Sequence, residues 1–176
     1  MIERKYLAHF IDANHVHTLD ASNLPTSYAT STNYVRLGEH LEQFNEELNA
    51  QVDVHRNILG EIYVVHAGYQ PQSSVDTFYA TNKSTDAAKA LYDWIERIVQ
   101  DRLTGDDCRT TMITAMIDMS NPTGIATWAY KEDCYIVPQT FGGDTSGIQV
   151  PFQIINAGKR VKVRFSLTTL KITGLA

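Results

Sequence analysis

The sequence is poor in cysteine and in basic residues, and it contains no long apolar run. Two cysteines among 176 residues are too few for the disulfide framework of a small secreted domain. No stretch approaches the ~20 apolar residues of a membrane-spanning helix. The basic residues near the N-terminus are not followed by the apolar run of a signal peptide. We therefore expect a soluble protein that is neither exported nor inserted in a membrane.

Positive charge is scarce as well, since 15 Lys and Arg residues oppose 20 Asp and Glu residues and give a formal net charge of -5. A dedicated reader of nucleic acid gains affinity by neutralising phosphates with basic side chains, so this class is disfavoured. Hydrophobic residues form 43% of the chain, which excludes extensive disorder. The length indicates a single domain, residues 1–176.

One helix and many strands are predicted from apolar spacing. The helix covers about residues 85–103, where the apolar residues fall on one helical face. Most of the remaining chain alternates with period two, which is typical of strands with one covered face. Two stretches are interpreted as irregular: a Ser-, Thr- and Asn-rich one at 14–32 and a long loop at 68–83. The fold class expected is mainly β, an antiparallel sandwich or barrel flanked by one principal helix.

Two strand patterns carry polar or charged rows. In the strand predicted from Leu48 to Ile58, one face is apolar and is expected to be buried. The other face is polar and is expected to meet water or a partner; it is formed by Asn49, Gln51, Asp53, His55 and Asn57. A second strand is predicted from Val161 to Leu167, and Asn156-Ala157-Gly158 before it is interpreted as a tight turn. Its basic row, Arg160, Lys162 and Arg164, is interpreted as a solvated or intersubunit face because the chain as a whole is acidic.

Two residue groups carry side chains suited to catalysis or metal binding, and neither forms a complete site. His15 and His17 have Asp12 and Asp20 nearby, but a zinc site needs a third and a fourth ligand with suitable geometry. Cys108 and Cys134 lack a local base and are interpreted as buried thiols. We therefore predict no catalytic residue, no metal ligand and no cofactor.

Two further groups have structural interpretations. The segment 142–147 (GGDTSG) lacks the Lys-Ser/Thr ending and the following helix of a phosphate-binding loop, so a hairpin is favoured. Glu132 and Asp133 are neighbours on a predicted strand and should point to opposite faces. Glu132 shares its face with apolar residues, which places it near the rim of the core or against a partner.

A set of segments in a fixed order is similar to a known family. The segments are YVRLG (34–38), FNEELN (44–49), NILGE (57–61), GYQPQSSVD (68–76), RLTGDDC (102–108) and QTFGGDTSGIQVPF (139–152). Together they resemble the major tail (tail tube) proteins of long-tailed phages and of related prophage tails of Gram-positive bacteria. The resemblance covers roughly residues 36–164.

The resemblance implies a structural virion protein without an active site or cofactor. Such proteins are small β-sandwiches or barrels with one helix. They form hexameric rings whose strands join into an inner β-barrel, and the rings stack into a tube through loops and terminal arms. The tube delivers the genome, and DNA passes through it without specific binding. The implied partners are copies of the chain, a tape measure protein and a tail terminator, and the location is the virion tail, assembled in the host cytoplasm.

Within this picture, Gln51, Asp53, His55 and Asn57 are candidates to face the lumen of the tube, where an acidic wall would repel DNA phosphates. The stretches 14–32 and 68–83 are candidates for contacts with neighbouring subunits. Two alternatives stay open. One is the inner tube of a contractile phage-like particle, and the other is a metal-dependent β-sandwich enzyme or ligand-binding domain that uses the region of His15 and His17.

Overall fold

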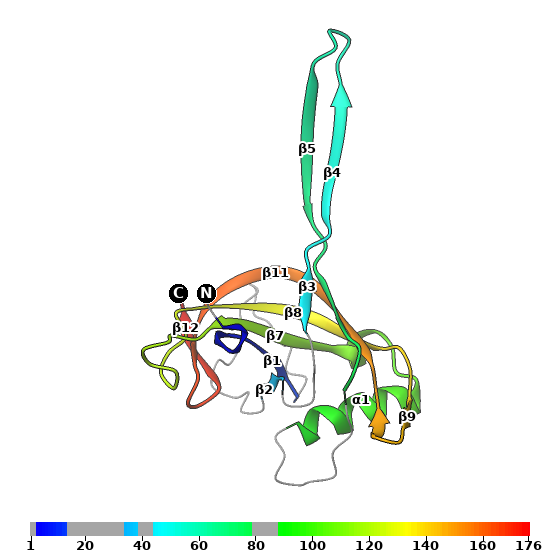
Figure 1. Ribbon diagram of the computed structural model, residues 1–176, viewed down its shortest axis with the longest axis vertical. Coiled ribbons are helices and arrows are strands. Elements are labelled where there is room, and N and C mark those ends of the chain that lie inside the picture. The colour runs from blue at the N-terminus through cyan, green and yellow to red at the C-terminus, as the bar shows by residue number, and fades with distance from the viewer. Residues whose placement is uncertain (1–2, 14–33, 39–43, 79–87) are drawn as a thin grey trace.

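In the part of the chain that the structure describes, the fold is a curled antiparallel sheet with a single α-helix against it (Figure 1). The computed structural model describes residues 3–13, 34–38, 44–78 and 88–176. The sheet has eight strands in the order β2-β1-β7-β8-β11-β6-β3, with β12 beside β11. The strands are β1 (Leu7–Asp12), β2 (Tyr34–Leu37), β3 (Asn45–Glu47), β6 (Gln72–Val75), β7 (Arg109–Met116), β8 (Trp128–Pro138), β11 (Phe152–Ser166) and β12 (Lys171–Leu175). The predicted fold class, mainly β with one helix, is confirmed.

Strand β11 is the longest strand of the sheet and pairs with three neighbours along its 15 residues. Its first half lies between β6 and β8, and its second half pairs with β8 and β12. The register against β8 shifts between Ala157 and Val161, and Gly158 has a φ of 76°. The tight turn predicted at 156–158 is therefore wrong. The chain forms a bulge there, which bends the strand while its pairing continues.

Helix α1 (Lys89–Asp101) covers one face of the sheet. It is shorter than the prediction of about 85–103, whose start lies outside the described residues. Arg102 ends the helix in the left-handed conformation (φ 49°), and its backbone N–H donates to the carbonyl of Ile98. The buried face of α1 packs into a cluster that includes these residues from the sheet: Ile11, Met112, Cys134, Ile136, Phe152 and Ile154.

The opposite face of the sheet is covered where β11 and β12 curl over it. Phe10, Ile113 and Phe165 are buried in this second cluster, and the Phe10 and Phe165 ring centroids lie 4.9 Å apart. Ile113 follows Met112 of the first cluster directly, so neighbouring residues of β7 face the two cores. The central strand β7 is therefore covered on both of its faces.

Charged side chains are buried in β8. Asp133 accepts hydrogen bonds from Lys131 (Nζ to Oδ1, 3.1 Å) and from Arg109 of β7 (Nη2 to Oδ2, 2.8 Å). Lys131 and Asp133 are 4% and 5% exposed, so the carboxylate supplies the counter-charge that a buried ammonium needs. Glu132 contacts Asn156 and Arg160 instead. The prediction that Glu132 and Asp133 point to opposite faces is thus confirmed.

The segment 142–147 forms a hairpin of β9 (Gly142–Asp144) and β10 (Gly147–Gln149), as predicted. A Cβ atom on Gly143 would lie 2.3 Å from the carbonyl oxygen of Gly147, so the close approach of the two strands requires glycine there. Asp106 and Asp107 lie in the short 3-10 helix η2 (Gly105–Cys108) between α1 and β7. A second 3-10 helix, η1 (Arg4–Tyr6), precedes β1.

The two stretches interpreted as irregular have different outcomes. The stretch 14–32 lies outside the described residues. The predicted loop at 68–83 is wrong in its first part, because it contains the end of a strand and the whole of β6, which is paired on both sides. Its end, from residue 79, lies outside the described residues. No helix in the described part of the chain is long and apolar enough to cross a membrane.

Candidate assembly surface

A long hairpin projects from the body and forms a separate two-stranded sheet (Figure 1). It consists of β4 (Ala50–Arg56) and β5 (Ile62–Tyr69), and residues 50–69 are called the projecting hairpin below. It continues outward from the β3–β6 pair, but Asn49 (φ 44°) interrupts the strand between β3 and β4. Asn49 Nδ2 donates to the carbonyl of Gln70 at 3.2 Å, and this hydrogen bond links the two adjacent segments of the chain at the break. The single strand predicted from Leu48 to Ile58 is corrected accordingly.

The turn of the projecting hairpin is built by Asn57 and Gly60. Asn57 Oδ1 accepts the backbone N–H groups of Leu59 (3.0 Å) and Glu61 (2.9 Å), and its Nδ2 donates to the Glu61 carboxylate at 2.8 Å. Gly60 has a φ of 83°, a conformation that suits glycine. A three-residue hairpin loop commonly combines a type I turn with a left-handed residue of this kind. The sequence therefore specifies a well-defined tip, Ile58 and Leu59.

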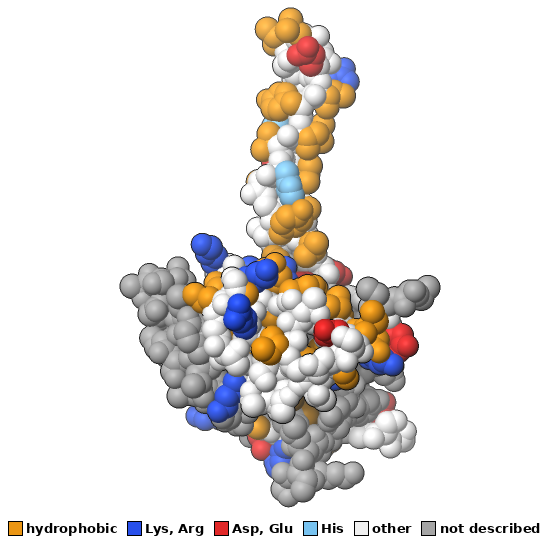
Figure 2. Space-filling model, turned by 90° about the vertical axis from the view of Figure 1, so that its left-hand side faces the viewer, with side chains coloured by type: hydrophobic (Ala, Val, Ile, Leu, Met, Phe, Trp, Pro, Cys, Tyr) orange, Lys and Arg blue, Asp and Glu red, His pale blue; other side chains and the backbone are white. Residues whose placement is uncertain are grey.

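Large hydrophobic side chains are concentrated on the projecting hairpin (Figure 2). With the adjoining Leu48, it carries ten of the sixteen large hydrophobic side chains that are exposed in the described part of the chain. At its tip, Ile58 and Leu59 are 103% and 79% exposed. An isolated two-stranded hairpin is at best marginally stable in water, and contiguous exposed apolar surface marks an interaction site. This surface is the strongest candidate for a functional site.

The two faces of the projecting hairpin differ mainly in the side chains that β4 contributes, and they are called its apolar face and its polar face below. On the apolar face, Val54 pairs with Val64, and the neighbouring pairs are Val52 with His66 and Arg56 with Ile62. On the polar face, Asp53 pairs with Val65 and His55 pairs with Tyr63. The His55 and Tyr63 rings stack with centroids 5.3 Å apart. Both faces are exposed in the single chain, because neither strand of the projecting hairpin is covered by the body.

The four lumen candidates lie on the projecting hairpin, away from both cores. Gln51, Asp53 and His55 are exposed on its polar face, as the alternation predicted. The burial predicted for the apolar face of this strand is wrong, because Val52 and Val54 are 48% and 66% exposed. Asn57 is half-buried in the turn, where its side chain holds the backbone, so it is not part of the strand. That these residues line a channel stays a prediction.

A polar cluster lies at the base of the projecting hairpin. Asn156 Nδ2 donates to the carboxylates of Glu46 and Glu132, each at 3.1 Å. Burial raises the pKa of the Glu132 carboxyl; the Arg160 guanidinium, 3.6 Å away, opposes that shift, and Glu46 adds to it. Glu132 thus lies at the rim of the core beside the hairpin base, which is one of its two predicted positions.

The basic row of β11 is exposed. Arg160, Lys162 and Arg164 alternate with the buried Val163 and Phe165, as predicted. The Arg160 guanidinium lies 4.5 Å from the Tyr130 ring centroid as well as beside Glu132. These contacts hold Arg160 within the chain, whereas the interpretation of the row as an intersubunit face stays a prediction.

The histidines, aspartates and cysteines that could serve catalysis or metal binding do not form a site in the described part of the chain. His15, His17 and Asp20 lie outside the described residues, and Asp12 is buried in β1. In the ranges that the structure describes, no three His, Cys, Asp or Glu side chains are grouped to hold a metal ion. Cys108 and Cys134 are free and buried, and burial raises the pKa of both thiols. A raised pKa disfavours the thiolate that nucleophilic chemistry requires.

The comparisons with known proteins find no match, either among models of protein families or among curated proteins. The projecting hairpin is the feature that the strand predictions missed as a unit. Its signal was nevertheless present, because Asn57-Ile58-Leu59-Gly60 separates two alternating segments and contains the glycine of a bulged hairpin loop.

Proposed function

We propose that the chain is a tail tube subunit of a long-tailed phage or related prophage tail, which self-assembles into stacked hexameric rings around a channel for DNA. The observation that supports this proposal best is the projecting hairpin, whose apolar face is exposed in the single chain. Val54 and Val64 are 66% and 61% exposed and lie opposite each other on that face. Packing this face against a neighbouring copy removes it from water and stabilises the hairpin.

The edges of the sheet support the same proposal. Within the described part of the chain, β2, β3 and β12 each pair on one side only. Unpaired strand edges are templates for association, and a closed ring of copies joins them edge to edge. A curled open sheet that is completed by its neighbours is the arrangement expected of a barrel shared between subunits.

Charge is compatible with a conduit for DNA. The chain is acidic overall, with a formal net charge of -5. Asp53 lies on the polar face of the projecting hairpin, opposite the apolar face assigned to the neighbour. A ring presents this carboxylate once per copy, and like charges on the wall and on the DNA backbone disfavour adhesion.

The experiment that tests the proposal removes the projecting hairpin and measures assembly. Residues 51–68 are replaced by Asn-Gly, so that Ala50 and Tyr69, which pair in the structure, are joined by a two-residue turn. Sedimentation velocity over a concentration series should show large ring- or tube-sized species for the natural chain and monomers for the variant.

The control is the thermal midpoint of the variant, which should stay close to that of the unassembled natural chain because the hairpin contributes to neither core. A natural chain that stays monomeric at every concentration would contradict the proposal. Equal assembly of the folded variant would contradict the role of the hairpin.

A further inference from the structure

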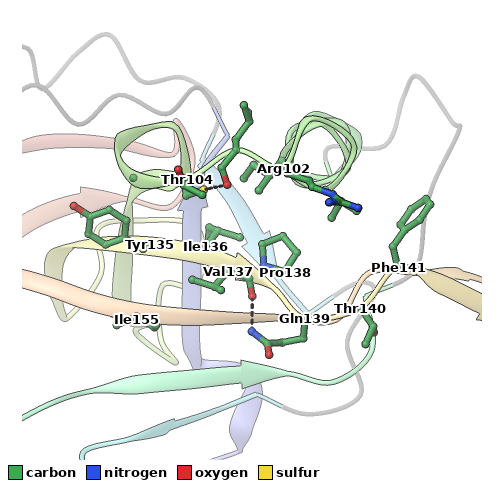
Figure 3. A pocket seen from close by; sticks show the side chains of 15 residues that line it. Arg102, Thr104, Tyr135, Ile136, Val137, Pro138, Gln139, Thr140, Phe141 and Ile155 are labelled. Carbon is green, nitrogen blue, oxygen red and sulfur yellow. Dashed lines mark hydrogen bonds between the residues drawn. The ribbon is translucent and has the colours of Figure 1, made fainter.

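An apolar hollow of about 730 Å³ lies between the end of α1 and the end of β8. Figure 3 shows Tyr135, Val137, Pro138 and Phe141 along one side of it, with Arg102 at the helix end. Ile98, Val99 and Leu103 complete the apolar wall. Phe141 and Ile155 are 48% and 41% exposed, so the hollow is open to solvent and its lining is incompletely covered.

The apolar tip of the projecting hairpin cannot reach this hollow in the same molecule. The projecting hairpin extends from the body away from α1, and its tip is the part farthest from the helix (Figure 1). Ile58 and Leu59 at the tip have almost no contact with the rest of the chain, being 103% and 79% exposed. The tip of the projecting hairpin and the hollow can therefore contact each other only between two copies of the chain.

We propose that the Ile58–Leu59 tip of one copy seats in the α1–β8 hollow of a neighbouring copy. This inference rests on the self-assembly proposed above and names the contact that joins the copies. Because the two surfaces differ, the contact is heterologous, and such contacts generate closed rings or open filaments according to the rotation between copies.

Charge complementarity supports this occupant. Glu61 follows the tip, and Arg102 lies at the rim of the hollow; both are exposed. Arg102 forms no ion pair with any other residue that the structure describes, so its guanidinium is available to a partner. A carboxylate is the partner that the fork of an arginine recognises best.

The experiment places a photoreactive p-benzoylphenylalanine at Leu59 in the assembled full-length chain and identifies its cross-links by mass spectrometry. We expect intermolecular cross-links to residues 98–105 and 135–141. In the reverse experiment the same group replaces Phe141, which is exposed and aromatic, and should cross-link to residues 56–61 of another copy. The matched control is Tyr63, an exposed aromatic residue of the polar hairpin face, where cross-links to the hollow should be absent.

A charge exchange gives an independent readout. Glu61→Arg or Arg102→Glu alone should weaken assembly a few-fold, as for an exposed ion pair, and the double variant should recover most of the loss. Assembly with cross-links from position 59 that map elsewhere would overturn this inference and leave the tail tube proposal standing. Absence of assembly in the natural chain would overturn both. A small apolar molecule that occupies the hollow in assembled material, found by mass spectrometry, would also overturn the inference.

Discussion

The apolar and polar faces of the projecting hairpin can be separated by replacing valine with threonine, which keeps the branched shape and the preference for strands. Val54 and Val64 form a directly opposed pair on the apolar face, and Val65 lies on the polar face. In the single chain all three side chains are exposed, so the substitutions should leave the folded monomer unchanged. In the assembly, only the apolar face is expected to lose contact with water.

The magnitude follows from the exposed fractions. A hydroxyl buried in protein without a partner costs about 1–3 kcal/mol. Val54 and Val64 are 66% and 61% exposed in the single chain, and only this exposed part can become buried when copies associate. We therefore assign about two-thirds of the burial cost of each hydroxyl to the free energy of assembly. For the double variant Val54→Thr/Val64→Thr this amounts to about 1.3–4 kcal/mol per contact, which lowers affinity between copies by roughly 10- to 700-fold.

The assay is sedimentation velocity over a concentration series, with circular dichroism of the dissociated protein as the test of folding. The matched control is Val65→Thr, which makes the same change one residue away on the other face and should shift assembly by less than about a factor of three. An equal or larger effect of Val65→Thr would refute the assignment of faces. An unchanged midpoint of assembly in the double variant would refute the apolar face as an interface.

Three further predictions concern stability. Asp133→Ala leaves the buried Lys131 ammonium without its counter-charge and should lower the free energy of unfolding by about 3–5 kcal/mol in urea titrations; a loss below 1 kcal/mol would contradict this. Burial raises the pKa of Glu132, so the folded chain holds that proton more tightly than the unfolded chain does, and stability falls as pH rises through the raised pKa. The free energy of unfolding of Glu132→Gln, measured in urea titrations, should therefore rise relative to that of the natural chain between acid and neutral pH. A difference between the two proteins that does not change with pH would contradict the raised pKa. Gly60→Val forces a branched residue to a φ of 83° and should loosen the hairpin by about 1–2 kcal/mol. Hydrogen exchange should then accelerate in β4 and β5 but not in β7 and β8, whereas acceleration throughout would contradict a local effect.

Patterns of apolar and polar residues predicted correctly those helices and strands in which burial alternates regularly along the chain. The apolar spacing of α1 identified the helix because its buried face follows the helical period. Alternation in the second half of β11 correctly separated the buried Val163 and Phe165 from the basic row.

Pairing between strands that are distant in the sequence determined the structure of segments for which the residue pattern was weak or misleading. The stretch Gln72–Val75 has a weak strand pattern, yet it is a strand because β11 and β3 pair with its two sides. At 156–158 the turn residues produce a bulge, since pairing with β8 resumes at Val161. Alternation also shows which residues share a face but not whether any partner covers it. The exposure of Val54 and Val64 was therefore visible only in the structure.

The most direct test of the central claim is electron cryomicroscopy of the purified protein at a concentration where it assembles. We expect hollow tubes of stacked six-fold rings in which the apolar face of each projecting hairpin, with Val54 and Val64, is covered by a neighbouring copy. The polar face with Asp53 should line or face the water-filled channel. Compact monomers with a free hairpin, or tubes in which Val54 and Val64 remain in solvent, would contradict the claim.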